Sequence, residues 1–270
     1  MKRTTTAVLF LAVLQLLGMD CYAGPLNFTV SKVSGFSGPF NVVYQVFGGG
    51  VSLDIKKDPS QTGAFAKYDV EGNMFGSQLG FDNAIKYDSF GNSSAVMIAA
   101  KGIYAKLSKQ GGWPGDMEIE TRLGNKADIR AVAVFFALAN YLPRIPEATN
   151  PFGENPTMKF KLRKFGNDIL VEGTGLSNFR LQQNSLGPRV QYAAKGSGFG
   201  KNFDGPDKLE IEIDNTFQSR SEYRVRGCGI DLTMTTDSFG GDPRLTVQGT
   251  PGDSTPLAAF VMGFAGYTGK

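Results

Sequence analysis

Short stretches of alternating apolar and polar residues make up most of this chain, and turns rich in glycine, proline and asparagine separate them. A period of two is typical of β-strands, whose successive side chains point to opposite faces of a sheet. In the first half of the chain, the pattern predicts strands at residues 28–32, 42–47, 51–55, 66–70, 95–100, 104–107 and 117–121.

The second half repeats this alternation, with strands predicted at residues 159–163, 169–172, 179–182, 189–193, 209–213, 223–226, 230–235 and 244–247. Composition agrees with the pattern, because 35 glycines and 21 phenylalanines among 270 residues are typical of many turns joined by aromatic strands. The sequence therefore predicts a mostly β fold.

Two segments, at about 129–142 and 256–267, break the alternation and are apolar on every side of a helix. Asn125 and Asp128 frame the start of the first helix, as an asparagine cap with an acid three residues later. Thr255 is expected to cap the second helix. Since neither helix has a polar face, each must be covered on nearly every side.

Strands that curl round these helices would cover them and would leave no open sheet edge. We therefore expect one or two closed, or nearly closed, antiparallel barrels packed around the apolar helices. A helix clamped between a sheet and its copy is the alternative.

A proline-rich segment at 143–157 divides the mature chain into two β-rich halves, 24–142 and 158–270, each ending in an apolar helix. The halves are two domains or parts of one. Three short motifs recur in the same order in both halves, which indicates an internal duplication. The motif pairs are 70–72 with 171–173, 99–102 with 193–196, and 118–120 with 210–212.

The first 23 residues have the features of a signal peptide. Lys2 and Arg3 precede an apolar core at 7–17, and small residues precede a cleavage site after Ala23. We expect a secreted protein, with an uncleaved N-terminal anchor as the alternative. Cys21 would leave with the signal, so Cys228 would remain as a single thiol without an internal disulfide.

Two further properties restrict the chemistry. The net charge is +3, and removal of the signal peptide lowers it to +2, which argues against a nucleic-acid-binding protein. There is no histidine, which excludes Ser–His–Asp and Cys–His catalysis, and a single thiol cannot form a zinc or iron–sulfur site. We expect no metal and no cofactor. Asn27 and Asn92 begin N-glycosylation sequons, which matter only in a eukaryotic source.

Three acids alternate along one predicted strand, at Asp116, Glu118 and Glu120. Their spacing places them on one face, and the pattern resembles the acid-rich strand of secreted laminarinase-type glycoside hydrolases. The aromatic segments that line the substrate cleft of that family are missing here. Because residues 210–214 alternate in the same way, a solvated strand is the simpler interpretation, with hydrolase chemistry as the alternative.

Cations alternate with apolar residues along two other predicted strands. If these strands were neighbours, their cations would form a patch for an anionic partner such as lipid headgroups or sulfated glycans. Lysine-rich edge strands that resist aggregation are the alternative interpretation. The candidate ligand-binding residues are Lys159, Lys161 and Arg163 on the first strand and Arg220, Arg224 and Arg226 on the second.

Several short motifs resemble hairpins of the tubby C-terminal-like superfamily, which includes LURP-one-related proteins and scramblases. They are the aromatic-x-Val-x-Gly motifs ending at Gly72 and Gly227, the Asp-x-x-Gly motifs ending at Gly91 and Gly240, and the segment 245–253 before the last helix. The resemblance implies a closed barrel around one central helix and a basic phosphoinositide-binding surface. The second apolar helix and the export signal depart from the family, and no binding residue of the family aligns with a position here.

The sequence thus predicts a secreted, non-enzymatic binding protein with an anionic ligand and no transmembrane segment in the mature chain. A structural or interaction scaffold is one alternative. A glycoside hydrolase that uses Asp116, Glu118 and Glu120 is the other.

Overall fold

The computed structural model describes residues 25–33, 42–58, 65–90, 93–100, 103–110, 116–123, 128–141, 158–173, 175–217, 219–237 and 244–268. The expected signal peptide with its cleavage site, the sequon asparagine Asn92 and the proline-rich segment 143–157 lie outside these residues.

The described chain is mostly β-strand, as predicted, with two helices. The first half contains β1 (Leu26–Lys32), β2 (Val42–Gly48), β3 (Val51–Lys57), β4 (Phe65–Met74), β5 (Ser77–Phe90), β6 (Ser93–Ala100), β7 (Ile103–Gln110), β8 (Asp116–Leu123) and α2 (Ile129–Tyr141). The second half contains β9 (Met158–Phe165), β10 (Asp168–Gly173), β11 (Ser177–Gln183), β12 (Arg189–Gly198), β13 (Lys201–Asn202), β14 (Leu209–Phe217), β15 (Arg220–Gly227), β16 (Ile230–Asp237), β17 (Arg244–Pro251) and α3 (Thr255–Thr268).

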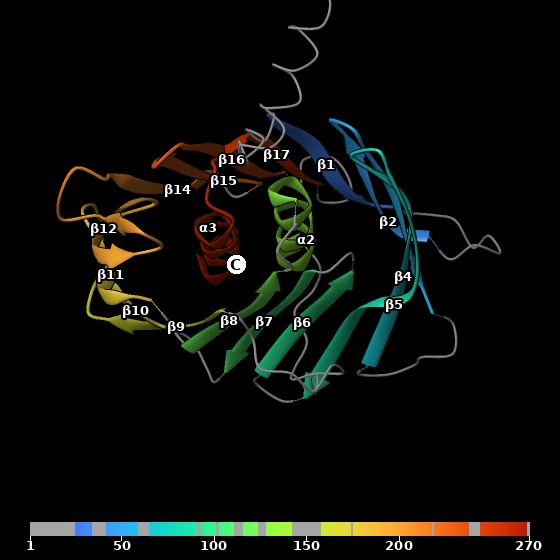
Figure 1. The fold of residues 1–270 in the computed structure, drawn as a ribbon, viewed down its shortest axis with the longest axis horizontal. Coiled ribbons are helices and arrows are strands. Elements are labelled where there is room, and N and C mark those ends of the chain that lie inside the picture. The colour runs from blue at the N-terminus through green and yellow to red at the C-terminus, as the bar shows by residue number, and fades with distance from the viewer. Residues whose placement is uncertain are drawn as a thin grey trace, which may run out of the picture.

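The strands form one antiparallel sheet in which each strand pairs with its neighbours in the chain. β8 pairs with β9, so the two halves join at this point, and the short β13 lies beside β12, which also pairs with β14. β1 pairs with both β2 and β17. In Figure 1 the strands surround α2 and α3.

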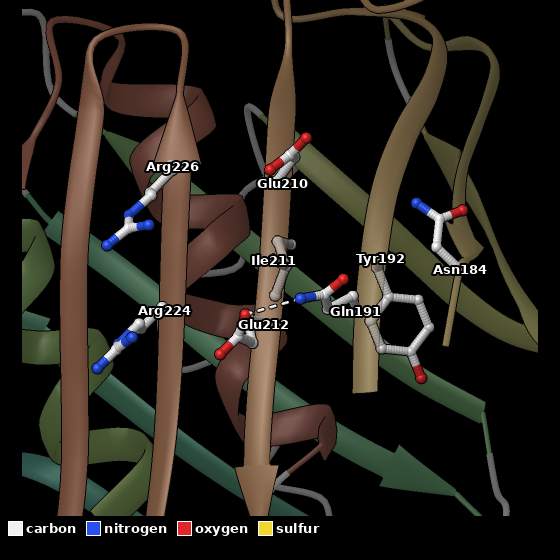
Figure 2. Close-up of a pocket in the computed structure, with 8 residues that line it drawn as sticks. All are labelled: Asn184, Gln191, Tyr192, Glu210, Ile211, Glu212, Arg224 and Arg226. Atoms are coloured by element: carbon white, nitrogen blue, oxygen red, sulfur yellow. Dashed lines mark hydrogen bonds between the residues drawn. The ribbon is translucent and has the colours of Figure 1, made fainter. Parts of the chain in front are cut away.

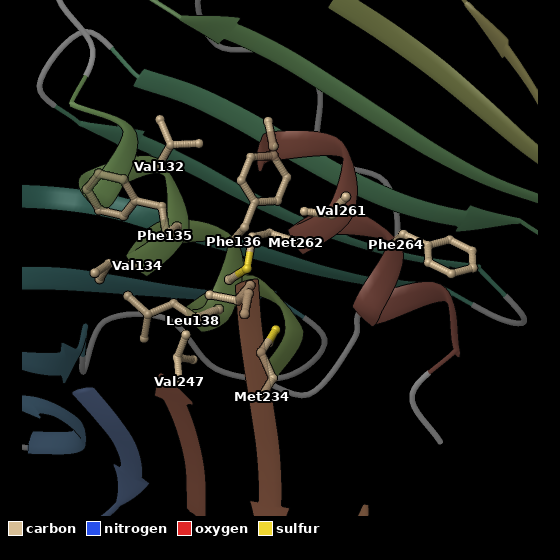
Figure 3. Close-up of a cluster of buried hydrophobic side chains, with 14 of the residues drawn as sticks. Val132, Val134, Phe135, Phe136, Leu138, Met234, Val247, Val261, Met262 and Phe264 are labelled. Carbon is tan, nitrogen blue, oxygen red and sulfur yellow. The ribbon is translucent and has the colours of Figure 1, made fainter. Parts of the chain in front are cut away.

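The core lies between the sheet and the two helices. Alternate residues of the strands face it, as Leu26, Phe28 and Val30 do on β1, and all three are at most 2% exposed. Every residue of α2 from 131 to 138 and of α3 from 257 to 264 is buried, so the expectation that both helices are covered on all sides is confirmed. Figure 3 shows their side chains packed together with those of the sheet.

The helix starts differ from the expected caps. Asp128, expected as the acid three residues after an asparagine cap, is itself the cap: its Oδ1 accepts a 2.9 Å hydrogen bond from the backbone N–H of Arg130. Asn125 lies outside the described residues. For α3 the prediction of Thr255 is wrong, because Ser254 Oγ accepts from the backbone N–H of Leu257 at 3.4 Å and Thr255 is the first helical residue.

The motif pairs behind the predicted duplication are only partly equivalent. The motif at 70–72 lies in β4 and its counterpart at 171–173 in β10, and these strands run in the same direction. The motifs at 118–120 and 210–212 lie in β8 and β14, which run in opposite directions because five antiparallel steps separate them. The third motif pair is therefore not structurally equivalent.

Candidate functional site

The predicted acidic and basic strands are direct neighbours. In the register of β8 with β9, Glu118 lies opposite Lys161 and Glu120 lies opposite Lys159. Asp116 lies opposite Gln110 on the other neighbour, β7. Opposite positions in an antiparallel pair share a face, where unlike charges stabilise the pairing. Two candidate sites that the sequence treats separately therefore form one strip of alternating charge.

The two basic strands, in contrast, do not meet. β9 pairs with β8 and β10, whereas β15 pairs with β14 and β16. The condition for a combined patch, that these strands are neighbours, is therefore not met. The cations at 159, 161 and 163 belong to a different part of the sheet from the arginines of β15.

The three arginines of β15 do share the outer face, as the alternation predicted, because Tyr223 and Val225 between them are buried. Their charge is compensated there. Arg220 and Arg224 both form ion pairs with Glu222, at 3.2 Å for Arg220. Arg226 Nε lies 3.9 Å from Asp231 Oδ1 on β16.

A small pocket of about 100 Å³ lies beside these arginines, between β12, β14 and β15 (Figure 2). Two glutamates and two arginines line it together with neutral residues, so its charges balance. Gln191 Nε2 donates a 2.9 Å hydrogen bond to Glu212 Oε2 across it. The full lining is Asn184, Gln191, Tyr192, Glu210, Ile211, Glu212, Arg224 and Arg226.

An ion pair lies next to this pocket on the same two strands. Arg189 on β12 binds Asp214 on β14 at 2.8 Å, two residues along from Gln191 and Glu212. Hydrogen bonds from Thr216 and then from Arg189 lower the pKa of the Asp214 carboxyl well below its usual range. The surface around β12, β14 and β15 is therefore a balanced network of charges, which does not favour a general anion-binding patch.

Sequence reasoning missed a different surface feature, which is a set of exposed apolar side chains at hairpin ends. Phe165, Leu186 and Phe217 are 71%, 77% and 67% exposed. They lie where β9 turns into β10, β11 into β12 and β14 into β15. Since β9, β11 and β14 run in the same direction, all three connections leave the sheet at one end. We call these three residues the apolar tips.

A cation accompanies each apolar tip. Lys164 precedes Phe165, and Arg189 and Arg220 each follow their tip by three residues, with Arg220 directly opposite Phe217 in the register. All three cations are exposed. The sequence signal is a large apolar residue beside a turn, as in Phe165 before Gly166 and Asn167. Alternation alone does not separate such a residue from a core position.

The remaining chemistry of the described residues is limited. They contain no group of three or more Cys, Asp or Glu residues placed to hold a metal ion. Cys228 is a free, half-buried thiol at the β15–β16 turn, and its Sγ donates to the carbonyl oxygen of Lys208 at 3.3 Å. Neither described helix is both long enough and apolar enough to cross a membrane.

Comparison with known proteins assigns no family: no protein-family model, no curated protein and no solved structure matches the chain.

Proposed function

We propose that the protein is a secreted, non-enzymatic binding protein that attaches to membrane surfaces containing anionic lipids. The observation that carries this proposal is that the apolar tips Phe165, Leu186 and Phe217 all lie at one end of the sheet. An anionic lipid surface is also the class of ligand that the sequence predicts. The proposed contact, however, lies at the hairpin ends and not on the faces of the basic strands.

The energetics fit reversible attachment. Moving an exposed phenylalanine or leucine side chain out of water is worth about 1.5–3 kcal/mol when its burial is complete. A basic residue near an anionic surface adds about 1 kcal/mol. Arg189 and Arg220 already have carboxylate partners, so we expect Lys164 to contribute more than either of them.

A rigid frame would hold the tips in place. We propose that this frame is a barrel closed around α2 and α3. The pairing of β1 with both β2 and β17 supports closure, since it brings the last strand beside the first. A closed barrel around apolar helices is also what the tubby-like resemblance implies, although here two helices are enclosed.

The register also fits a non-enzymatic role. Glu118 and Glu120 each lie opposite a lysine position, where unlike charges stabilise the pairing of neighbouring strands.

Co-sedimentation with vesicles tests the membrane proposal. We expect the mature chain to sediment with phosphatidylcholine vesicles containing phosphatidylserine, less so at high salt because salt screens the cations. The triple variant Phe165→Ser, Leu186→Ser, Phe217→Ser should bind at least about tenfold more weakly, which corresponds to about 1.4 kcal/mol.

Phe47 provides the matched control. It is 73% exposed but lies beside the β2–β3 turn at the opposite end of the sheet. Phe47→Ser should therefore bind vesicles like the unchanged protein. Equal binding by the triple variant, or no binding by the unchanged protein, would overturn the proposal.

Secretion has its own test. N-terminal sequencing of the exported protein should give Gly24 as the first residue. A product that retains residues 1–23 would contradict cleavage and favour an anchor.

A further inference from the structure

β10 and β11 separate over part of their length. They pair at Ile169 with Leu181 and at Leu170 with Arg180. Beyond these positions, the register of β11 with β12 shifts between Ser177 and Arg180. Asn178 lies within this shift at a φ of 51°, a conformation that bends a strand away from its neighbour. The irregular backbone opens the hairpin towards the β10–β11 connection.

The opened hairpin forms a pocket of about 610 Å³. This volume falls within the range of pockets that hold small molecules, about 300–1,000 Å³. Both apolar and charged residues line it. Among them are Leu170, Glu172, Leu176, Arg180, Lys195 and Asp204.

Two cations face each other at this pocket. Arg180 on β11 lies directly opposite Lys195 on β12, and the buried residues on either side of each show that both point to the outer face. The register row continues through Leu170 to Arg163 on β9. Three cations therefore lie in one row across β9 to β12. Like charges in opposite positions destabilise a sheet unless something compensates them.

Arg180 and Lys195 have no direct ion-pair partner. Within the part of the chain that the structure describes, neither side chain takes part in an ion pair. This differs from the arginines of β15, which have Glu222 and Asp231. Glu172 and Asp204 line the same pocket, and neither forms an ion pair with these two cations.

We propose that this pocket binds a small organic molecule through a single phosphate group held between Arg180 and Lys195. The planar fork of an arginine can donate to two phosphate oxygens at once, and the lysine adds a compact charge. Leu170 and Leu176 offer apolar contact for the carbon part of the ligand. Because two acids line the pocket as well, it disfavours polyanions such as sulfated glycans.

This site is separate from the apolar tips. The pocket opens towards the β10–β11 connection, and the tips lie at the opposite ends of the same strands. Ligand binding and vesicle binding are therefore expected to fail independently, and the variants below should sediment with vesicles like the unchanged protein.

Titration calorimetry at constant ionic strength tests the proposal, with inorganic phosphate and glycerol 3-phosphate as probes. Both should bind the mature protein, glycerol 3-phosphate more tightly. Arg180→Gln and Lys195→Gln should each raise the Kd at least about tenfold, because each removes a charged hydrogen-bond donor to the phosphate. Lys57→Gln, at an exposed cation on β3, should leave the Kd unchanged.

The outcomes separate the alternatives. Unchanged affinity in both pocket variants, with thermal unfolding like that of the unchanged protein, would overturn the site. Binding of phosphate without any gain for glycerol 3-phosphate would overturn the organic ligand. If the unchanged protein bound neither probe, the proposal would be wrong even where vesicle binding is intact.

Discussion

The hydroxyl group of Tyr223 on β15 donates a 2.7 Å hydrogen bond to the main-chain carbonyl oxygen of Val261 in α3. The tyrosine is 7% exposed and Val261 is fully buried. A buried hydroxyl without a partner would be costly, so this bond fixes where α3 can sit against the sheet. Burial also raises the pKa of Tyr223 well above its usual value, which keeps the donor protonated.

Tyr223→Phe removes this hydrogen bond and keeps the ring. We expect the free energy of unfolding to fall by about 1 kcal/mol. Urea denaturation followed by circular dichroism measures it. Tyr223→Leu should cost more, because it also removes the aromatic contact with Phe264. A phenylalanine variant as stable as the unchanged protein would show that the bond does not hold α3.

The pair of Tyr68 and Tyr44 predicts sensitivity to alkaline pH. Burial, and then the charge on Tyr44, raise the pKa of Tyr68 to about 12, whereas an unfolded tyrosine titrates near 10. Protonated Tyr68 therefore contributes stability that is complete below about pH 10 and is lost as the pH rises through about 12.

The measurement is urea denaturation at a series of pH values from 9 to above 11. Stability should fall across this range, and Tyr68→Phe should fall less because it has no proton to lose at this site. If the variant and the unchanged protein lose the same stability, the cause lies elsewhere.

Gly227 ends β15 in a conformation that other residues adopt with strain. Its φ is +117°, and a Cβ atom there would lie 1.9 Å from the carbonyl oxygen of Lys208. We expect Gly227→Ala to cost about 3 kcal/mol or more, because the backbone of both strands must move. Gly80→Ala is the control, since Gly80 has open space around its Cβ position. Thermal unfolding should separate the two variants clearly, and similar melting temperatures would contradict the close approach.

The strands show what local pattern can predict. Alternation located all of them except β5 and the short β13. β5 contains Gly80, Asp82 and Asn83, which strands seldom contain, and its local sequence does not predict a strand. It forms because β4 and β6 pair with it on either side. Tertiary pairing overrides propensity in this strand.

The candidate site was harder to predict because it depends on register. Alternation correctly placed Arg224 and Arg226 on one face, but it could not show which strands lie beside β15. The juxtaposition of Arg180 with Lys195 joins positions fifteen residues apart, and it depends on where the turn between β11 and β12 falls. Alternation alone does not give this register. The exposure of Phe165 likewise depends on where β9 ends.

The charge strip between β8 and β9 gives the last prediction. Lys161 lies opposite Glu118 on one side and Glu172 on the other. Lys161→Glu would place three acids in one register row, and we expect it to destabilise the fold by about 1 kcal/mol. Glu118→Lys would place two cations side by side and should also destabilise it. The double variant restores an opposite pair between β8 and β9, so its loss should be smaller than the two single losses added together. Urea denaturation of the four proteins measures the coupling, and strictly additive losses would mean that the two positions do not interact.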